Sequence, residues 1–409
     1  MKLHLTGPSD KYLKETITIT GSKSESNRSL LLAALYPAIR IENLSNSDDA
    51  QVMEKGLKIT NGTVDIHHAG TAMRFLTGYF ASQEGKEVVL TGSKRMTERP
   101  IKILVDALKS LGADISYVQD EGYPPINIKG KRIVKDKVSL PANVSSQYIS
   151  SLLLIAPSLE NGLQLELVGK ITSVPYIKMT LGLLDEIGVK SSFEGNSIKV
   201  YPKANIVPTK LVVESDWSSA SYFYSVCALS DVGSEITLSA YKKESLQGDS
   251  VLSKIYTSFG VETTYGENII TLKKTAKKVS AENEFDLANA PDIAQTIAVT
   301  CFGLGVGCHL TGLHTLKIKE TDRLVALDTE LSKLGATVSV TDKTLTLSTS
   351  IGIVTDIAID TYNDHRMAMA FAPLAMRTTL YVNDAEVVSK SYPDFWNDLK
   401  QLHFTIREL

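Results

Sequence analysis

The chain has 409 residues, of which 43% are hydrophobic and 22% charged, and its formal net charge is −3. This composition is typical of a soluble globular protein and excludes a disordered, collagen-like or disulfide-scaffold chain. The lack of a basic excess argues against nucleic-acid binding, and the length predicts two or three domains.

The chain carries no signal for export or membrane insertion. Its first residues lack the apolar core of a signal peptide, and no apolar run approaches the roughly 20 residues needed to span a bilayer. The three cysteines, Cys227, Cys301 and Cys308, lie in apolar stretches without metal-ligand spacing. An odd number of such residues is typical of reduced thiols. We therefore expect a cytoplasmic protein without a metal site.

Six segments along the chain are rich in small and apolar residues on nearly every side. They cover residues 26–37, 71–82, 146–157, 218–229, 292–305 and 365–376. Helices that are apolar all round are buried, so these segments predict six buried helices. A short strand is expected after each of them, for example at 163–169 and 235–241.

Amphipathic segments alternate with the buried ones. Four of them, at 101–118, 180–194, 251–265 and 324–340, contain a glycine where the helical pattern ends, and these glycines are spaced by 72 to 76 residues. They are Gly112, Gly188, Gly260 and Gly335. Glycine takes the left-handed conformation easily, so each is predicted to end a surface helix. Alternating residues after each glycine predict paired strands. Two weaker copies lie at 48–60 and 394–406.

The pattern predicts six copies of strand, buried helix, strand, surface helix, strand and strand. The sixth copy ends at Leu409 one strand short, and the N-terminal stretch that includes Thr16 to Ile19 could complete it. We therefore expect an α/β protein with two domains of three copies each. One would span residues 20–215, and the other would combine residues 1–19 with 216–409. A cleft between two such domains is the default place for a ligand.

Polar residues gather at the starts of the predicted buried helices. They are Lys23, Ser24, Arg28, Gly70, Thr71, Arg74, Ser145, Ser146, Gln147, Ser218, Ser219, Asp292, His365 and Arg366. Helix starts carry unpaired N–H groups that favour anions, so converging starts with added Lys and Arg predict a polyanion site. Serines alone could simply be N-caps. Lys23 and Arg28, within GSKSESNR, are harder to explain by structure alone.

Four more segments are dense in charge next to predicted buried elements: 95–100, 317–323, 361–371 and 387–395. Charge runs on helices usually form solvated faces, and 317–323 alone would carry little weight. Because four such segments lie next to predicted buried elements, we do not expect all of them to be solvent-exposed surface.

In this order the motifs GSKSESNR, AGTAMRF, RMTERP, SSQY, PDIAQT, KETDR, NDHRMAM and SKSYPDF resemble the 5-enolpyruvylshikimate-3-phosphate synthase family over essentially the whole chain. The resemblance implies a two-domain inside-out α/β barrel, each domain with three βαβαββ units and buried helices around an interdomain cleft. It also implies a reaction of the shikimate pathway of aromatic amino acid biosynthesis. Phosphoenolpyruvate would transfer its enolpyruvyl group to the 5-hydroxyl of shikimate 3-phosphate and release inorganic phosphate. The route is addition and elimination through a tetrahedral intermediate, without a cofactor or metal, in a protein that we expect to be a monomer.

The resemblance also implies roles for individual residues. Asp292 resembles the base at the 5-hydroxyl, Glu320 the proton donor at C3, and Lys23 a catalytic lysine that touches both substrates. Shikimate 3-phosphate would be bound by Lys23, Ser24, Arg28, Ser145, Ser146, Gln147, Ser173, Asp292, Thr315 and Lys319. Phosphoenolpyruvate would be bound by Lys23, Gly70, Arg99, Gln147, Arg323, Arg366 and Lys390.

These residues suit the chemistry. The two substrates together carry about five to six negative charges, and the cations at the motifs outnumber Asp292 and Glu320. Arginine suits bidentate contacts with phosphate and carboxylate, and the two acids can take and return protons. The chain departs from the usual family pattern at His68, Phe75 and Thr315. His365 is expected to position Arg366.

Three other functions fit the residues less well. The sister transferase that acts on UDP-N-acetylglucosamine usually has a reactive cysteine in its active-site loop, whereas the loop around 95–100 here has none. A polyanion-binding protein without catalysis would not need both Asp292 and Glu320. A nucleotide site at Gly303, Gly305 and Gly307 is disfavoured, because these glycines follow a helix rather than open one.

Overall fold

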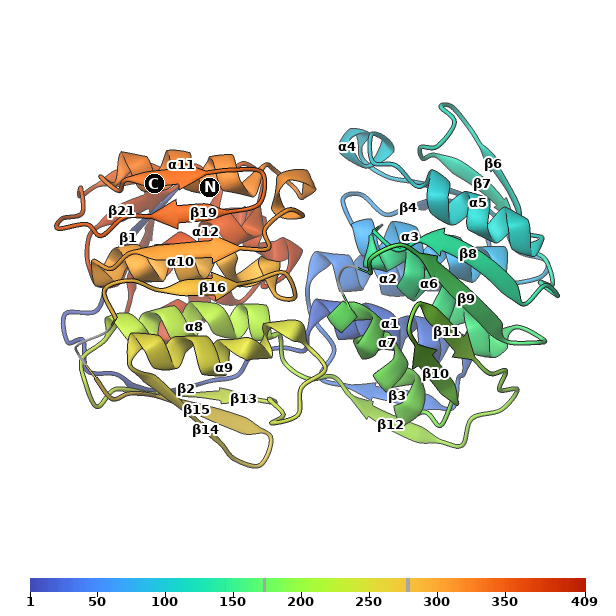
Figure 1. The fold of residues 1–409 in the computed structure, drawn as a ribbon, viewed down its shortest axis with the longest axis horizontal. Coiled ribbons are helices and arrows are strands. Elements are labelled where there is room, and N and C mark those ends of the chain that lie inside the picture. Colours follow the sequence, from blue (N-terminus) through green and yellow to red (C-terminus); the bar gives the residue numbers. More distant parts are fainter. Residues whose placement is uncertain (144, 172–173, 277–279) are drawn as a thin grey trace. The chain divides into compact units, whose positions relative to one another are not determined.

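The computed structural model describes residues 1–143, 145–171, 174–276 and 280–409. The chain forms two compact units (Figure 1). We call residues 21–213 the N-terminal unit, and residues 1–20 with 214–409 the C-terminal unit.

Each unit contains buried helices. In the N-terminal unit these are α1 (Lys23–Leu35), α3 (Gly70–Ala81) and α6 (Ser146–Ile155). In the C-terminal unit they are α8 (Trp217–Leu229), α10 (Ala294–Leu304) and α12 (His365–Phe371). All 13 residues of α8 are buried. The prediction of helices that are apolar all round is confirmed.

Small hydroxyl side chains let two of these helices pack closely without leaving polar groups unpaired. Ser221 of α8 and Thr296 of α10 are 3.0 Å apart between their hydroxyl oxygens. One turn further along both helices, Thr300 donates to Ser225 at 2.8 Å. The serines and threonines inside these apolar segments are therefore part of the helix contact.

The second helix type lies nearer the surface. It comprises α2 (Asp48–Leu57), α5 (Lys102–Leu111), α7 (Val174–Glu186), α9 (Leu252–Ile255), α11 (Arg323–Lys333) and α13 (Phe395–Gln401). A short helix, α4 (Lys94–Thr97), precedes α5. Gly112 and Gly260 have φ of 112° and 71° at the ends of their helices, as predicted from the repeat. The expected helix at 251–259 is divided, with α9 between two 3₁₀ turns.

Five four-stranded sheets share one plan, in which a parallel pair is followed by two antiparallel neighbours. In the N-terminal unit the orders are β4 (Asn61–Asp65), β5 (Glu87–Thr91), β7 (Ile126–Lys129), β6 (Asp114–Tyr117), and β8 (Lys137–Pro141), β9 (Leu163–Val168), β11 (Ser197–Val200), β10 (Ser191–Glu194).

In the C-terminal unit one order is β2 (Lys14–Ile17), β13 (Glu235–Ser239), β15 (Ile269–Lys274), β14 (Val261–Tyr265). The second is β16 (Glu284–Asp286), β17 (Cys308–Thr311), β19 (Leu345–Leu347), β18 (Val338–Val340). The third is β20 (Ile357–Ile359), β21 (Leu380–Val382), β1 (Leu3–Thr6), β22 (Thr405–Glu408). Alternate residues of these strands, such as Ile236 and Leu238, face the buried helices and complete the core.

The strand that completes the sixth copy comes from the N-terminus, but not from Thr16 to Ile19. It is β1, which pairs antiparallel with both β21 and β22. Residues Lys14–Ile17 form β2 instead, which lies parallel to β13 and opens the fourth copy. Both segments alternate as half-buried strands do, and this pattern does not specify which sheet a strand joins.

The first copy is shorter than the others. Its strand β3 (Ile39–Glu42) pairs in parallel with β12 (Thr209–Val212), which arrives from the end of the N-terminal unit. Helix α2 then leads directly to β4. The last strand of this unit thus closes onto its first copy.

Candidate active site

The starts of the three buried helices in the N-terminal unit lie at one end of that unit. Gln147, in the first turn of α6, donates from Nε2 to Thr71 Oγ1, in the first turn of α3, at 3.1 Å. Arg28, in the second turn of α1, donates to Ser150 of α6 at 2.9 Å. The unpaired N–H groups of three helix starts therefore gather where the sequence places its cations, which favours an anion there.

Arg28 is a buried cation whose hydrogen bonds go to neutral oxygens. Its side chain donates to Thr180 Oγ1 at 2.8 Å, to Ser150 Oγ, and to the Ser24 carbonyl at 2.8 Å. The rings of Phe75 and Tyr176 lie 5.3 and 5.9 Å away. Burial lowers the pKa of Arg28 to about 10. A phosphate beside it would offset the cost of burying this charge.

Lys23 begins α1 and has a carboxylate partner. Its Nζ lies 3.4 Å from Asp49 Oδ2, at the start of α2, and both side chains are largely buried. Ser145 acts as the N-cap of α6, because its Oγ accepts from the Gln147 N–H at 3.4 Å. Ser146 is 9% exposed at the first helical position. Ser173, the remaining predicted phosphate contact, lies outside the described residues.

Gly70 and Arg99 are in direct contact. A Cβ atom at Gly70 would lie 2.7 Å from Arg99 Nη1, so the guanidinium occupies the space that a side chain would need. Arg74, one turn into α3, donates to the Gly70 and Pro100 carbonyls at 3.2 and 3.1 Å. It therefore ties the helix start to the chain beside Arg99. Burial, and then the charge of Arg99, lowers the pKa of Arg74 to about 10.

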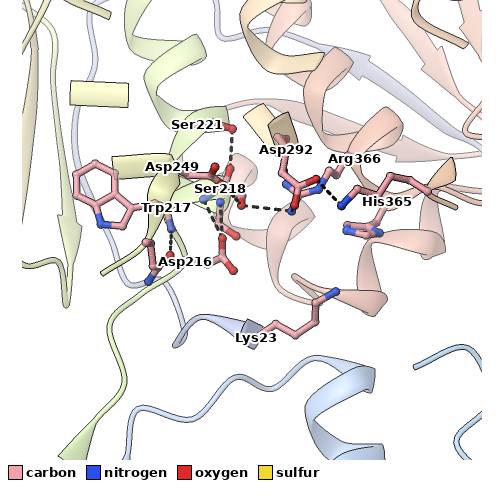
Figure 2. A network of polar contacts seen from close by, with 12 residues as sticks. Lys23, Asp216, Trp217, Ser218, Ser221, Asp249, Asp292, His365 and Arg366 are labelled. Atoms are coloured by element: carbon pink, nitrogen blue, oxygen red, sulfur yellow. Dashed lines mark hydrogen bonds and ion pairs between the residues drawn. The ribbon is translucent and has the colours of Figure 1, made fainter. Parts of the chain in front are cut away.

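The C-terminal unit also brings three helix starts together (Figure 2). Arg366 of α12 lies 3.3 Å from Asp292 Oδ2, just before α10, and donates to Ser218 Oγ of α8 at 3.3 Å. Ser218 in turn donates to Asp249 Oδ2 at 2.5 Å. A continuous polar chain thus runs from Asp249 through Ser218 and Arg366 to Asp292.

Arg323 contacts three carboxylates. Its Nε donates to Asp364 Oδ2 at 2.6 Å, Nη1 to Asp292 Oδ1 at 2.8 Å, and Nη2 to Glu320 Oε2 at 2.8 Å. The side chain is 1% exposed. Burial lowers its pKa, but Asp364, Glu320 and Asp292 outweigh burial and raise it above the usual value. Arg323 therefore contacts both Asp292 and Glu320, the two residues that the family resemblance implies in proton transfer.

Asp292 is the centre of this cluster. Besides the two arginines, Lys319 Nζ lies 3.5 Å from its Oδ1. Burial raises the pKa of Asp292, but Arg366, Lys319 and Arg323 together hold it well below the usual value. Asp249 behaves in the opposite way, since burial and the nearby Asp292 raise its pKa to about 7. Two neighbouring aspartates thus differ widely in proton affinity.

The other predicted residues of this unit lie at the edge of the cluster. Lys390 donates from Nζ to the Asn363 carbonyl at 2.7 Å. Thr315 has a buried hydroxyl that finds no hydrogen-bond partner within the described ranges. His365 is buried, with Nδ1 3.9 Å from Asp364 Oδ1. The expectation that His365 positions Arg366 stays a prediction.

The structure brings in carboxylates that the sequence analysis did not place at the site. Asp364 contacts Arg323, Asp49 contacts Lys23, and Asp249 reaches Arg366 through Ser218. The local cationic excess is therefore smaller than the motifs suggested. Asp364 stands inside the NDHR motif and could have been noticed there. Asp249 sits in an ordinary loop sequence, SLQGDS, with no signal of its own.

The cysteines lie away from this chemistry. All three are free and buried, Cys227 in α8, Cys301 in α10 and Cys308 in β17. Cys308 thus lies in a strand, whereas Cys227 and Cys301 lie in buried helices. Burial raises the pKa of Cys227 to about 12. Such thiols are packing residues rather than nucleophiles.

A metal site and a membrane-spanning helix are both absent from the described residues. Nowhere in them do three or more His, Cys, Asp or Glu side chains form a group suited to a metal ion. Within the same ranges, no helix is both long and apolar enough to cross a membrane.

Comparison with known proteins places the chain in a family. Residues 59–399 match the sequence model of EPSP synthase (3-phosphoshikimate 1-carboxyvinyltransferase). A 3-phosphoshikimate 1-carboxyvinyltransferase from Bacteroides fragilis is 47% identical, covering 100% of this chain and 99% of the relative. One from Haemophilus influenzae is 35% identical, covering 95% and 96%.

A solved structure of EPSP synthase from Acinetobacter baumannii superposes with a TM-score of 0.83 at 20% identity, covering 100% of both chains. This likeness confirms the predicted two-domain inside-out α/β fold. The sequence matches extend over the motifs from which the resemblance was inferred. The chain belongs to the EPSP synthase (3-phosphoshikimate 1-carboxyvinyltransferase) family.

Proposed function

We propose that the chain transfers the enolpyruvyl group of phosphoenolpyruvate to the 5-hydroxyl of shikimate 3-phosphate and releases inorganic phosphate. One observation carries the proposal beyond family membership: the Asp292 carboxylate lies among Arg366, Lys319 and Arg323 where three helix starts meet. Such a site offers both a proton acceptor and cations for an anionic substrate.

The N-terminal unit supplies the contacts proposed for shikimate 3-phosphate. Arg28 is the main one, because its guanidinium is buried, its hydrogen bonds go to neutral oxygens, and a phosphate would compensate its charge. The remaining proposed contacts from this unit are Lys23, Ser24, Ser145, Ser146, Gln147 and Ser173. Asp292, Thr315 and Lys319 are proposed from the C-terminal unit.

For phosphoenolpyruvate we propose Arg99, Arg323, Arg366 and Lys390, with Lys23, Gln147 and Gly70, whose missing side chain leaves room for the Arg99 guanidinium. Arg323 and Arg366 contact Asp292 here. An incoming anion would share these cations with the carboxylates. Asp292 would then be held less tightly in the charged form, and its pKa would rise toward that of a useful acid–base group.

The proposed chemistry balances with these groups. The 5-hydroxyl oxygen attacks C2 of the enol and gives its proton to Asp292, while Glu320 protonates C3. The tetrahedral intermediate then loses phosphate, which takes the proton held by Asp292, and a C3 proton returns to Glu320, so that the double bond is restored. Lys23 and the arginines stabilise the negative charge on phosphate and carboxylate. Acid–base groups and cations suffice for each step, so we propose no cofactor.

We further propose that the protein is a cytoplasmic monomer. Three free, buried cysteines suit a reducing compartment. The sister reaction on UDP-N-acetylglucosamine is less well supported, because the loop at 95–100 has no cysteine and the described thiols are buried.

The test is phosphate release on mixing the protein with both substrates, with either substrate alone as the control. Release that requires both, with the enolpyruvyl product seen by mass spectrometry, is the expected result. Asp292→Asn should still bind shikimate 3-phosphate by calorimetry but lose roughly 10²-fold or more in turnover, as expected for a lost acid–base group. Turnover near that of the wild type would remove Asp292 from the mechanism, and no release by the wild type would reject the activity.

A further inference from the structure

The turn that leads into α12 has an unusual backbone. Tyr362 and Asn363 are consecutive non-glycine residues with φ of 54° and 56°. The left-handed region is costly for residues with a Cβ, and most costly for bulky ones such as tyrosine. Two neighbours in this region persist only where the surroundings hold them. The Asp364 N–H donates to the Thr361 carbonyl across the turn at 2.8 Å, and the Asn363 side chain is exposed, so any further hold comes through Tyr362.

Tyr362 is held by Glu330. Its hydroxyl donates to Glu330 Oε1 at 2.6 Å. Glu330 is fully buried in α11, and its other oxygen accepts from the Asp360 N–H at 3.2 Å. Lys333, one turn further along α11, lies 2.9 Å from the same carboxylate and 2.8 Å from Asp360 Oδ2. Glu330 therefore fixes the chain on the N-terminal side of the turn.

Helix α11 contacts this segment at a second point. Arg323 and Glu330 are seven residues apart, so they lie on one face of the helix, two turns from each other. Arg323 contacts Asp364, on the C-terminal side of the turn, at 2.6 Å. Both flanks of the strained turn are thus attached to the same face of one helix.

The turn presents two groups to the site. The Asn363 carbonyl accepts from Lys390 Nζ at 2.7 Å. Asp364 is the N-cap of α12, where its Oδ1 accepts from the Arg366 N–H at 2.9 Å, and its Oδ2 orients Arg323. The directions of Lys390, Arg323 and Arg366 therefore all depend on the backbone at 362–364.

We propose that Glu330 and Tyr362 are positioning residues of the active site, because their hydrogen bond holds the left-handed turn that sets Lys390, Arg323 and Arg366. This inference rests on the proposed function, in which these three cations bind phosphoenolpyruvate. Burial and then the bond to Glu330 raise the pKa of Tyr362 to about 12, so the hydroxyl keeps its proton and remains a donor at neutral pH.

The main test is Tyr362→Phe in the full-length protein, which removes one oxygen from a 37% exposed side chain. The KM for phosphoenolpyruvate should rise about five- to tenfold, the size expected from one lost hydrogen bond. The KM for shikimate 3-phosphate should change less than about twofold, because most of its proposed contacts, Arg28 among them, are in the other unit. Tyr12→Phe, at a 52% exposed tyrosine, is the matched control and should change neither.

A second variant separates positioning from simple stability. Glycine takes positive φ without strain, so Asn363→Gly should make the turn less dependent on Tyr362. In that background Tyr362→Phe should raise the KM for phosphoenolpyruvate less than it does alone. Equal losses in both backgrounds, or a lower melting temperature with an unchanged KM, would overturn the inference.

A third measurement does not require activity. Lys390 should be acetylated faster by an amine-reactive reagent in Tyr362→Phe than in the wild type, relative to the exposed Lys400 in the same digest. An unchanged ratio would overturn the inference. If the wild type released no phosphate, the proposed function would fail, but this labelling comparison would still test the hold of Tyr362 on the turn.

Discussion

Asp249 and Asp292 show how much the surroundings of one residue type can differ within a few ångströms. Asp292 faces three cations and stays charged, whereas Asp249 reaches its nearest cation only through the Ser218 hydroxyl. The sequence shows both aspartates, but which side chains contact each of them is decided only by the fold. For this reason the cations of the site were predictable from motifs, and the carboxylates Asp49 and Asp249 were not.

The raised pKa of Asp249 has a measurable effect on stability. Burial, followed by Asp292, raises it to about 7, whereas an unfolded aspartate titrates near 3.9. The folded state therefore binds the proton more tightly. Between about pH 4 and pH 7 the protein's free energy of unfolding therefore falls as the pH rises, and this loss of stability is complete above about pH 7.

Asp249→Asn should remove this dependence, since the amide oxygen still accepts from Ser218. We expect the variant to gain stability relative to the wild type on going from pH 5 to pH 8, by on the order of 1 to 3 kcal/mol. Urea unfolding at both pH values measures the difference. Asp120→Asn, at an exposed position, is the control. The same difference at pH 5 and pH 8 for Asp249→Asn would contradict the argument.

At the scale of elements, the buried helices were the most predictable part of the fold. Segments such as 218–229 are apolar on all faces over a helical length, and few structures other than a buried helix accommodate this. The strands were less predictable. Leu3–Thr6 and Lys14–Ile17 have similar alternating patterns, and only the tertiary structure decides which of them joins β21 and which joins β13.

Strand β1 should contribute strongly to stability, because it pairs on both sides within its sheet. Leu5 of β1 is 0% exposed, so Leu5→Ala would leave a cavity between the sheet and the buried helices. We expect a loss of about 2 to 5 kcal/mol in the free energy of unfolding, measured with urea. Leu409→Ala, at a side chain that is 69% exposed, should cost little. Equal effects of the two substitutions would show that β1 is dispensable.

At the scale of the molecule, the internal repeat made the architecture predictable from the sequence. Helix-ending glycines at spacings of 72 to 76 residues and six apolar segments indicated the copies directly. The repeat did not indicate that β3 of the first copy pairs in parallel with β12. No local signal marks a strand that returns from more than 160 residues away to close a unit.

The two units should differ when they are expressed separately. Residues 21–213 contain every strand of their own sheets, so this fragment should fold alone, with cooperative melting followed by circular dichroism. Residues 214–409 lack β1 and β2, which belong to two of the three sheets of that unit, and should not fold. Adding residues 1–20 in trans as a peptide should restore structure. Cooperative folding of 214–409 alone would contradict this account.

The pairing of β1 with β22 brings the two chain ends together. Leu3 lies opposite Glu408, and the Leu409 N–H donates to the Lys2 carbonyl at 3.0 Å. A short peptide could therefore join the ends, and the chain could be reopened between Val213 and Glu214. In such a circular permutant, each unit would be one uninterrupted stretch, and a single covalent crossing would replace the present two. The interrupted C-terminal unit is thus a matter of where the polypeptide begins, not of how it is folded.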